Sequence, residues 1–127
     1  MLSHDKYLDV LQNIEFAIVS VYKYQNELTD YEVTFALEAL IDFYISEQRN
    51  REPRNFNLSD NSTEVYEEVK RMCDFRLGRT ALGERETEEP ISSGEIVECL
   101  KKIKNSVNKW TKQSGRQGYL DFVKDYV

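Results

Sequence analysis

Apolar side chains in this sequence recur at three- and four-residue intervals, which is the spacing of one face of an α-helix. Residues 3–25 form the first such stretch, and its apolar face is made by Leu8, Leu11, Ile14, Ile18, Val21 and Tyr22. A second helix is predicted from Thr29 or Asp30 to about Asn50, with apolar residues around most of its circumference. A helix of that kind is either central in its fold or covered by a partner.

The asparagine-rich run NREPRNFNLSDNS contains a proline and predicts a polar loop, with Phe56 and Leu58 as apolar anchors. A third helix is predicted over the run STEVYEEVKRMCDFRL that follows. Asn61 and Glu64 have the spacing of a capping box at its start, and Gly78 is placed to end it.

Ser92 and Glu95 have the spacing of a second capping box, and the fourth predicted helix runs from there to about Ser114. Its apolar residues form a narrow seam of the coiled-coil type: Ile96, Leu100, Ile103, Val107 and Trp110. The segment YLDFVKDY is predicted to form a short helix that packs back onto the others. We therefore expect a single domain, residues 1–127, folded as an all-α bundle of four main helices plus a short C-terminal helix.

The charge and cysteine content restrict the setting of the protein. The chain has 127 residues and a net charge of -6, which argues against nucleic acid as its main partner. Its two cysteines, Cys73 and Cys99, form no disulfide or metal-binding pattern, so a reducing, cytoplasmic compartment is expected. No uncharged apolar stretch approaches the roughly 18 residues needed to cross a bilayer, and no membrane association is expected.

Two charged residues occupy positions where the helical spacing predicts core. Glu15 projects among Leu8, Leu11, Val19 and Tyr22 in the first helix, and Arg76 lies on the face of Val65, Val69 and Met72 in the third. A buried carboxylate is costly unless it is protonated, hydrogen-bonded or paired with a cation. We predict that both side chains are buried and that Glu15 is a structural group, with Arg76 or a tyrosine hydroxyl as its partner.

A catalytic alternative joins Glu15 to Glu38 and Asp42 of the second helix, with Glu64, Glu67 or Glu68 of the third as further carboxylates. Carboxylates that converge from several helices can bind Mg²⁺ or Mn²⁺ or act as acid and base. The sequence has one histidine, so the Glu-x-x-His pairs of di-iron bundles are missing. Glu38 and Asp42 also fit a solvated polar stripe, and that interpretation is favoured over a metal site.

A basic run, KKIKNSVNKWTKQSGR, stands out in this acidic chain. Its six positive residues, with no acidic one between them, are Lys101, Lys102, Lys104, Lys109, Lys112 and Arg116. We call them the lysine face. They fit a solvated helical face that complements the helix dipole, or alternatively a surface that binds anions, nucleic acid or an acidic partner.

Signatures of other enzyme classes are missing from the sequence. The five glycines form no phosphate-binding loop, and no nucleophile lies in a recognisable constellation with a histidine. Enzymatic function is therefore disfavoured, and no cofactor is expected.

The C-terminal block SSGEIVECLKKIKNSVNKWTKQSGRQGYLDFV resembles small all-helical cyanobacterial proteins. The resemblance covers about the last third of the chain. It implies a bacterial cytosolic setting, and no activity or site residue.

The sequence leads to an expectation of a non-catalytic helical interaction or regulatory module. The alternatives are a carboxylate-based, metal-dependent enzyme and an anion- or nucleic-acid-binding protein that uses the lysine face. Because the first two helices are apolar over about twice the usual arc, a homodimer that buries these helices is expected, together with an unidentified protein partner.

Overall fold

The computed structural model describes residues 4–24, 27–79 and 90–107. Within these ranges the chain forms α1 (His4–Tyr24), α2 (Asp30–Gln48), α3 (Asp60–Arg76) and a fourth helix whose described part spans 93–107, and it forms no strand. The predicted all-α class is therefore confirmed. The rest of the fourth helix and the predicted short C-terminal helix lie outside the described residues.

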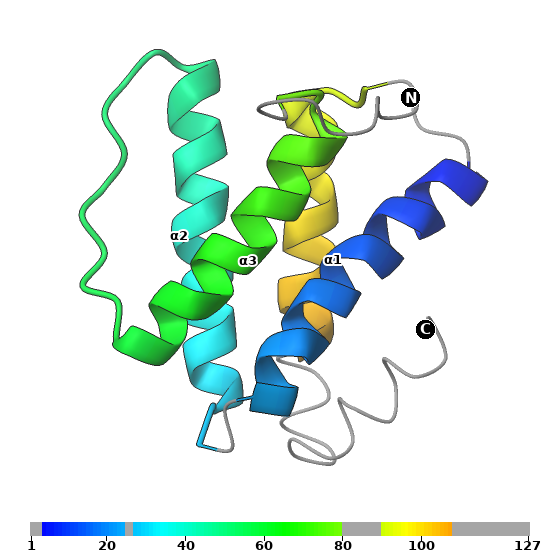
Figure 1. Ribbon diagram of the computed structural model, residues 1–127. Coiled ribbons are helices and arrows are strands. Elements are labelled where there is room, and N and C mark those ends of the chain that lie inside the picture. The colour runs from blue at the N-terminus through cyan, green and yellow to red at the C-terminus, as the bar shows by residue number, and fades with distance from the viewer. Residues whose placement is uncertain (1–3, 25–26, 80–89, 108–127) are drawn as a thin grey trace.

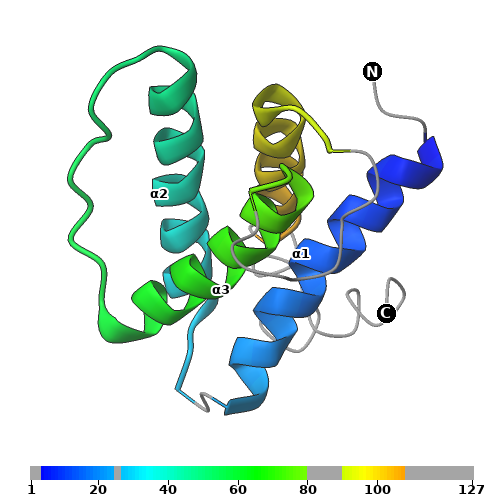
Figure 2. The same cartoon turned by 45° about the horizontal axis from the view of Figure 1, so that its top comes forward.

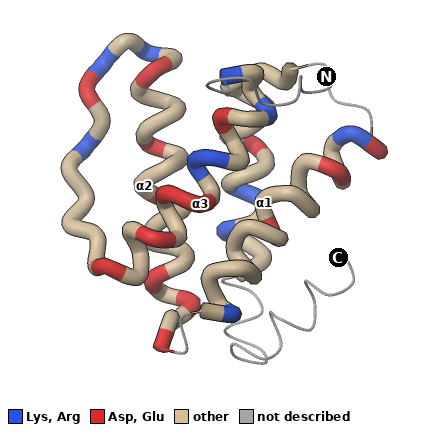
Figure 3. Tube along the Cα trace, viewed as in Figure 1, with Lys and Arg blue, Asp and Glu red and all other residues tan. Residues whose placement is uncertain are grey.

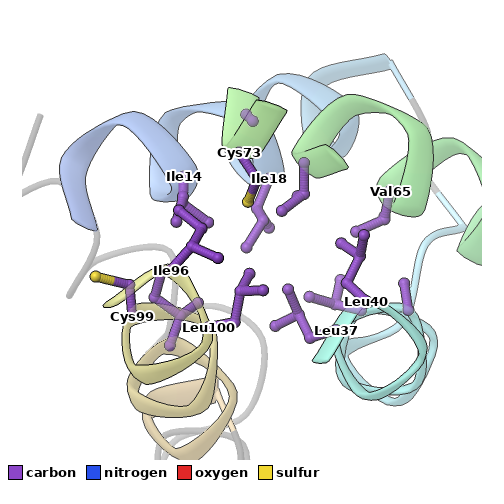
Figure 4. Close-up of a cluster of buried hydrophobic side chains, with 14 of the residues drawn as sticks. Ile14, Ile18, Leu37, Leu40, Val65, Cys73, Ile96, Cys99 and Leu100 are labelled. Atoms are coloured by element: carbon purple, nitrogen blue, oxygen red, sulfur yellow. The ribbon is translucent and has the colours of Figure 1, made fainter. Parts of the chain in front are cut away.

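The helices form two layers. In the close-up of Figure 4, α2 and the fourth helix are seen nearly end-on, whereas α1 and α3 run across the view above them. Figures 1 and 2 both show α1 next to α3. They also show that the loop that joins α2 to α3 runs along the outer side of α2. α1 and α3 are antiparallel, because Arg76 at the end of α3 pairs with Asp9 near the start of α1.

The apolar faces of all four helices meet between the two layers. Five fully buried side chains (0% exposed) point into one cluster: Ile14 and Ile18 of α1, Leu37 of α2, and Ile96 and Leu100 of the fourth helix (Figure 4). The burial of an aliphatic side chain of this size contributes about 1.5–3 kcal/mol. The predicted seam of the fourth helix is thus confirmed as far as Val107, while Trp110 lies outside the described residues.

α2 is the most buried of the labelled helices, as its apolar circumference predicts. Its buried apolar residues are Val33, Ala36, Leu37, Ala39, Leu40 and Tyr44. The hydroxyl of Tyr44 donates to Asp74 Oδ1 of α3 at 2.8 Å, and Asp74 Oδ2 accepts from Lys70 Nζ at 2.7 Å. The polar end of this fully buried ring is therefore satisfied, as a buried hydroxyl requires.

One carboxylate fastens the starts of two helices together. Thr29 is the N-cap of α2 and forms a capping box with Glu32. The Glu32 carboxylate also accepts from Ser59 Oγ at 2.9 Å and from Asn61 Nδ2 at 3.4 Å. Burial alone would raise the pKa of Glu32, but hydrogen bonds from Thr29, Ser59 and Asn61 outweigh it and lower that pKa.

The predicted capping box of Asn61 and Glu64 is wrong. Ser59 is the N-cap of α3, and its hydroxyl accepts from the Ser62 backbone N–H at 3.1 Å. The helix begins earlier than predicted because Ser59 has an extended backbone and a short side-chain acceptor, while Asn61 is occupied by Glu32.

The predicted end of α3 and the predicted start of the fourth helix are confirmed, whereas the predicted end of the fourth helix near Ser114 lies outside the described residues. Gly78 follows α3 with a φ of +79°, a left-handed conformation that favours glycine, and a Cβ there would lie 3.1 Å from Pro90 Cγ. The Ser92 and Glu95 capping box is present, with Glu95 Oε1 accepting from Ser92 N at 3.0 Å and Ser92 Oγ accepting from Glu95 N at 3.2 Å. In the part of the chain covered by the structure, no helix is both long and apolar enough to span a membrane.

Candidate functional site

Glu15 and Arg76 are both buried, as the sequence predicts, with exposed fractions of 3% and 7%. Of the two partners predicted for Glu15, Arg76 is wrong, and a tyrosine hydroxyl stays a prediction. Arg76 Nη1 contacts Asp9 Oδ2 of α1 at 2.9 Å, because the antiparallel packing brings the end of α3 beside the first turns of α1. Glu15 has an interaction of its own. Both residues are thus buried in the layer of α1 and α3.

Glu38 and Asp42, the other carboxylates of the proposed metal site, each contact basic groups. Glu38 Oε1 pairs with Lys104 Nζ of the fourth helix at 3.2 Å. Asp42 accepts from Arg51 Nη2 at 3.1 Å and from the Arg54 backbone N–H at 2.7 Å. Among residues 4–24, 27–79 and 90–107, no three side chains of His, Cys, Asp or Glu gather as metal ligands.

Asp42 holds the loop between α2 and α3 against α2. Burial alone would raise the pKa of its carboxyl, but the hydrogen bonds from Arg54 N and Arg51, together with the positive charge of these arginines, lower that pKa. The carboxylate is therefore ionised and fixed at neutral pH. It works as a structural anchor for the loop.

The lysine face is described in part. Lys101 and Lys102 are exposed, and Lys104 is half-buried in its pair with Glu38. Lys109, Lys112 and Arg116 lie outside the described residues.

The acidic stripe of α2 and the lysine face, which the sequence presents as separate candidates, meet at one surface hollow. This hollow has a volume of about 350 Å³ and lies between α2, the loop that follows it and the fourth helix. Its walls include Glu38 and Asp42 on one side and Lys101 and Lys104 on the other. We call it the α2 hollow.

A larger groove runs along the outer side of α1 and α3. Two adjoining hollows of about 700 Å³ and about 220 Å³ form it, and they share Ser20, Glu67 and Glu68. Phe16 and Tyr24 of α1 line it and are 51% and 85% exposed. We call it the α1–α3 groove.

Acidic residues predominate in the first half of α3, which forms one wall of this groove, and basic residues follow farther along (Figure 3). Glu64, Glu67 and Glu68 line it toward the start of α3, next to Tyr24. The residues toward its other end are mostly basic: Lys70, Arg71 and Arg79, with Asp74 among them. Basic residues thus gather toward one end of the groove, and each is paired within the chain: Lys70 with Asp74, Arg71 with Glu68 and Arg79 with Glu47.

Sequence reasoning missed the α1–α3 groove. Its signal was Phe16, an aromatic residue on the polar side of α1, opposite Ile14 and Ile18. A large apolar side chain that is exposed on a helix and bordered by a hollow is typical of a binding surface.

The two cysteines are free, buried thiols. Burial and the nearby carboxylates Glu95 and Glu98 raise the pKa of Cys99 to about 11, and burial also raises the pKa of Cys73. A raised pKa keeps a thiol protonated and unreactive. Both cysteines therefore serve as small core residues.

Comparisons of this chain with protein-family models, with curated proteins and with solved structures found no match. Two surface features of the described residues, the α1–α3 groove and the α2 hollow, are therefore the candidate sites of its function.

Proposed function

We propose that this protein is a non-catalytic interaction module that acts as a homodimer, with the α1–α3 groove as the contact surface between two copies. The observation that carries the proposal is Phe16, which is 51% exposed at an apolar groove of about 700 Å³. A two-fold contact buries such a surface with the same patch on both subunits.

The dimer expected from the sequence relied on the apolar arcs of both α1 and α2, and the chain itself covers much of the α2 arc. Six apolar residues of α2 are buried, whereas Phe35, Ile41, Phe43 and Ile45 are half-buried and Tyr31 is exposed. The large hydrophobic residues that stay exposed in the described residues are Phe16, Tyr24 and Tyr31. Because the first two line the groove, the proposed contact surface narrows to α1 and α3.

The charges of the groove favour a second copy as its occupant. In an antiparallel two-fold contact, the acidic end of one groove faces the basic end of the other, and the reverse holds at the same time. Glu64 and Glu67 of one subunit then lie near Arg71 and Arg79 of its partner. One charge gradient thus supplies two favourable contacts.

The α1 wall has the same two-fold character. Phe16, Ser20 and Tyr24 are four residues apart and therefore lie along one edge of the helix. An antiparallel pairing centred near Ser20 sets each Phe16 beside the partner's Tyr24. Aromatic pairs of this kind contribute about 0.5–1.5 kcal/mol beyond the burial of their area.

The bacterial, cytoplasmic setting and a further protein partner belong to the same proposal. The cysteine content and the sequence resemblance support the setting.

Complementary charge reversal tests the antiparallel contact. One variant carries Glu64→Lys and Glu67→Lys, and a second carries Arg71→Glu and Arg79→Glu. Each variant alone sets like charges against each other at both ends of the interface and is expected to be monomeric. An equimolar mixture restores opposite charges at both ends and is expected to form a heterodimer.

Light scattering measures the mass of each sample, and circular dichroism checks that each variant is folded. Wild-type protein that stays monomeric overturns the homodimer. A wild-type dimer whose two variants fail to associate when mixed overturns the antiparallel arrangement in the groove.

A further inference from the structure

The α2 hollow is large enough to hold a small molecule. Its volume of about 350 Å³ lies within the range of about 300–1,000 Å³ that is typical of ligand pockets. Ile41 and Ile45 of α2 and Phe56 of the following loop give it an apolar floor. Phe56 is held in place by Phe35, whose ring it meets edge-on with a centroid distance of 5.6 Å.

Three cations line the hollow from two elements. Arg54 comes from the loop, and Lys101 and Lys104 come from the fourth helix. Lys104 Nζ forms an ion pair with Glu38 Oε1 at 3.2 Å. The guanidinium of Arg54 lies over the Phe56 ring at 5.1 Å, and Lys101 is exposed. In the described residues, neither the Arg54 guanidinium nor the Lys101 ammonium forms a direct ion pair with a carboxylate, although the Arg54 charge acts on Asp42.

The acidic residues of the hollow have their direct contacts with other groups. Asp42 is occupied by Arg51 Nη2 at 3.1 Å and by the Arg54 backbone N–H at 2.7 Å. Glu38 is occupied by Lys104. The hollow therefore carries two positive charges outside any described ion pair, one from the loop and one from the fourth helix, beside apolar side chains, in a chain whose net charge is -6.

We propose that the α2 hollow binds a small anionic ligand with an apolar or aromatic body. The anionic group, a phosphate or a carboxylate, lies between the Arg54 guanidinium and the Lys101 ammonium, and the apolar body lies on Ile41, Ile45 and Phe56. Arginine suits this role because its planar donors match both phosphate and carboxylate oxygens. The site goes beyond the proposed function and does not depend on dimer formation.

Calorimetric titration of the full chain with 1-naphthyl phosphate tests the site. Arg54→Gln and Lys101→Gln are each expected to weaken binding about fivefold, the effect of a partly exposed charged contact worth about 1 kcal/mol. Lys102→Gln is the matched control, because Lys102 is an exposed neighbour on the same helix that does not line the hollow. It is expected to leave the affinity unchanged.

Titrations with inorganic phosphate and with 1-naphthol separate the two halves of the ligand. Both are expected to bind at least about tenfold more weakly than 1-naphthyl phosphate, because each engages one part of the site. No saturable binding of 1-naphthyl phosphate overturns the proposal. Equal weakening by Arg54→Gln, Lys101→Gln and Lys102→Gln also overturns it, since that pattern indicates a diffuse electrostatic attraction instead of a site.

Discussion

Arg76 of α3 is buried and forms its ion pair with Asp9 of α1, whose side chain is 49% exposed. The guanidinium therefore reaches from the core of the α1 and α3 layer to its edge, where the carboxylate remains partly in water. Within the described part of the chain, Arg76 Nη2 is buried without a hydrogen-bond partner. The Asp9 carboxylate is thus the main compensation for a charge that the fold has largely removed from solvent.

Replacement of Asp9 by alanine is expected to lower the free energy of unfolding by about 1–2 kcal/mol. Breaking a fully buried pair costs more, but Asp9 is half-exposed and water replaces part of the contact. Urea denaturation measures the change, with Glu98→Ala as the control, because Glu98 is an exposed carboxylate on the fourth helix. Equal effects of the two substitutions would show that Arg76 does not depend on Asp9.

Glu32 links the N-terminal caps of α2 and α3, so Glu32→Ala is expected to destabilise the protein by about 1–2 kcal/mol, the usual effect of a lost cap. The folded pKa of Glu32 is lowered from 4.5. Its contribution is therefore present above pH 4.5 and is lost as the pH falls through the folded pKa. Urea denaturation at neutral pH and at pH 3 checks this: the difference between the two proteins is expected to shrink at the lower pH.

The two buried thiols are expected to resist modification in the folded protein. Burial raises both pKa values above the unfolded value of about 8.5, so the folded state keeps the two protons at a pH where the unfolded chain loses them. This contribution to stability is complete below about pH 8.5 and is lost as the pH rises further. Reaction with a disulfide reagent at pH 8 is expected to be slow in buffer and complete in denaturant. Rapid reaction of either thiol in buffer contradicts the burial of the cysteines.

Asp42→Asn is expected to release the loop between α2 and α3, because the amide keeps little of the charge attraction that holds Arg51 and Arg54. Limited trypsin digestion detects the release as faster cleavage after these two arginines. Glu38→Gln is the matched control, since Glu38 lies one turn earlier on α2 and contacts Lys104 instead. A cleavage rate in Asp42→Asn no higher than in the control would show that Asp42 does not anchor the loop.

Helical spacing alone predicted the elements of this fold and the burial of its unusual charged residues. Glu15 and Arg76 were placed in the core because they share a face with apolar neighbours, and that periodicity depends only on helix geometry. The partner of Arg76 was missed because Asp9 lies toward the polar side of α1. A long arginine side chain can reach such a residue once the helices are antiparallel, and the sequence does not show that orientation.

The candidate sites were predicted less well, because both depend on how helices pack. Asp42 lies on α2 and Lys101 lies on the fourth helix, and the packing of these two helices brings both residues to the α2 hollow. The α1–α3 groove needs the apposition of Phe16 with the charged edge of α3. Neither neighbourhood has a signature in the spacing of a single helix.

Light scattering over a concentration series tests the central claim, the homodimer formed through the α1–α3 groove, most directly. The chain has a mass of 15.0 kDa, and the wild-type mass is expected to approach twice this value as the concentration rises. Phe16→Asp is expected to remain at 15.0 kDa, whereas Tyr31→Asp, which changes an exposed aromatic residue outside the groove, is expected to dimerise like the wild type. A wild-type mass that stays at 15.0 kDa throughout, or a Phe16→Asp variant that dimerises as well as Tyr31→Asp, would contradict this account.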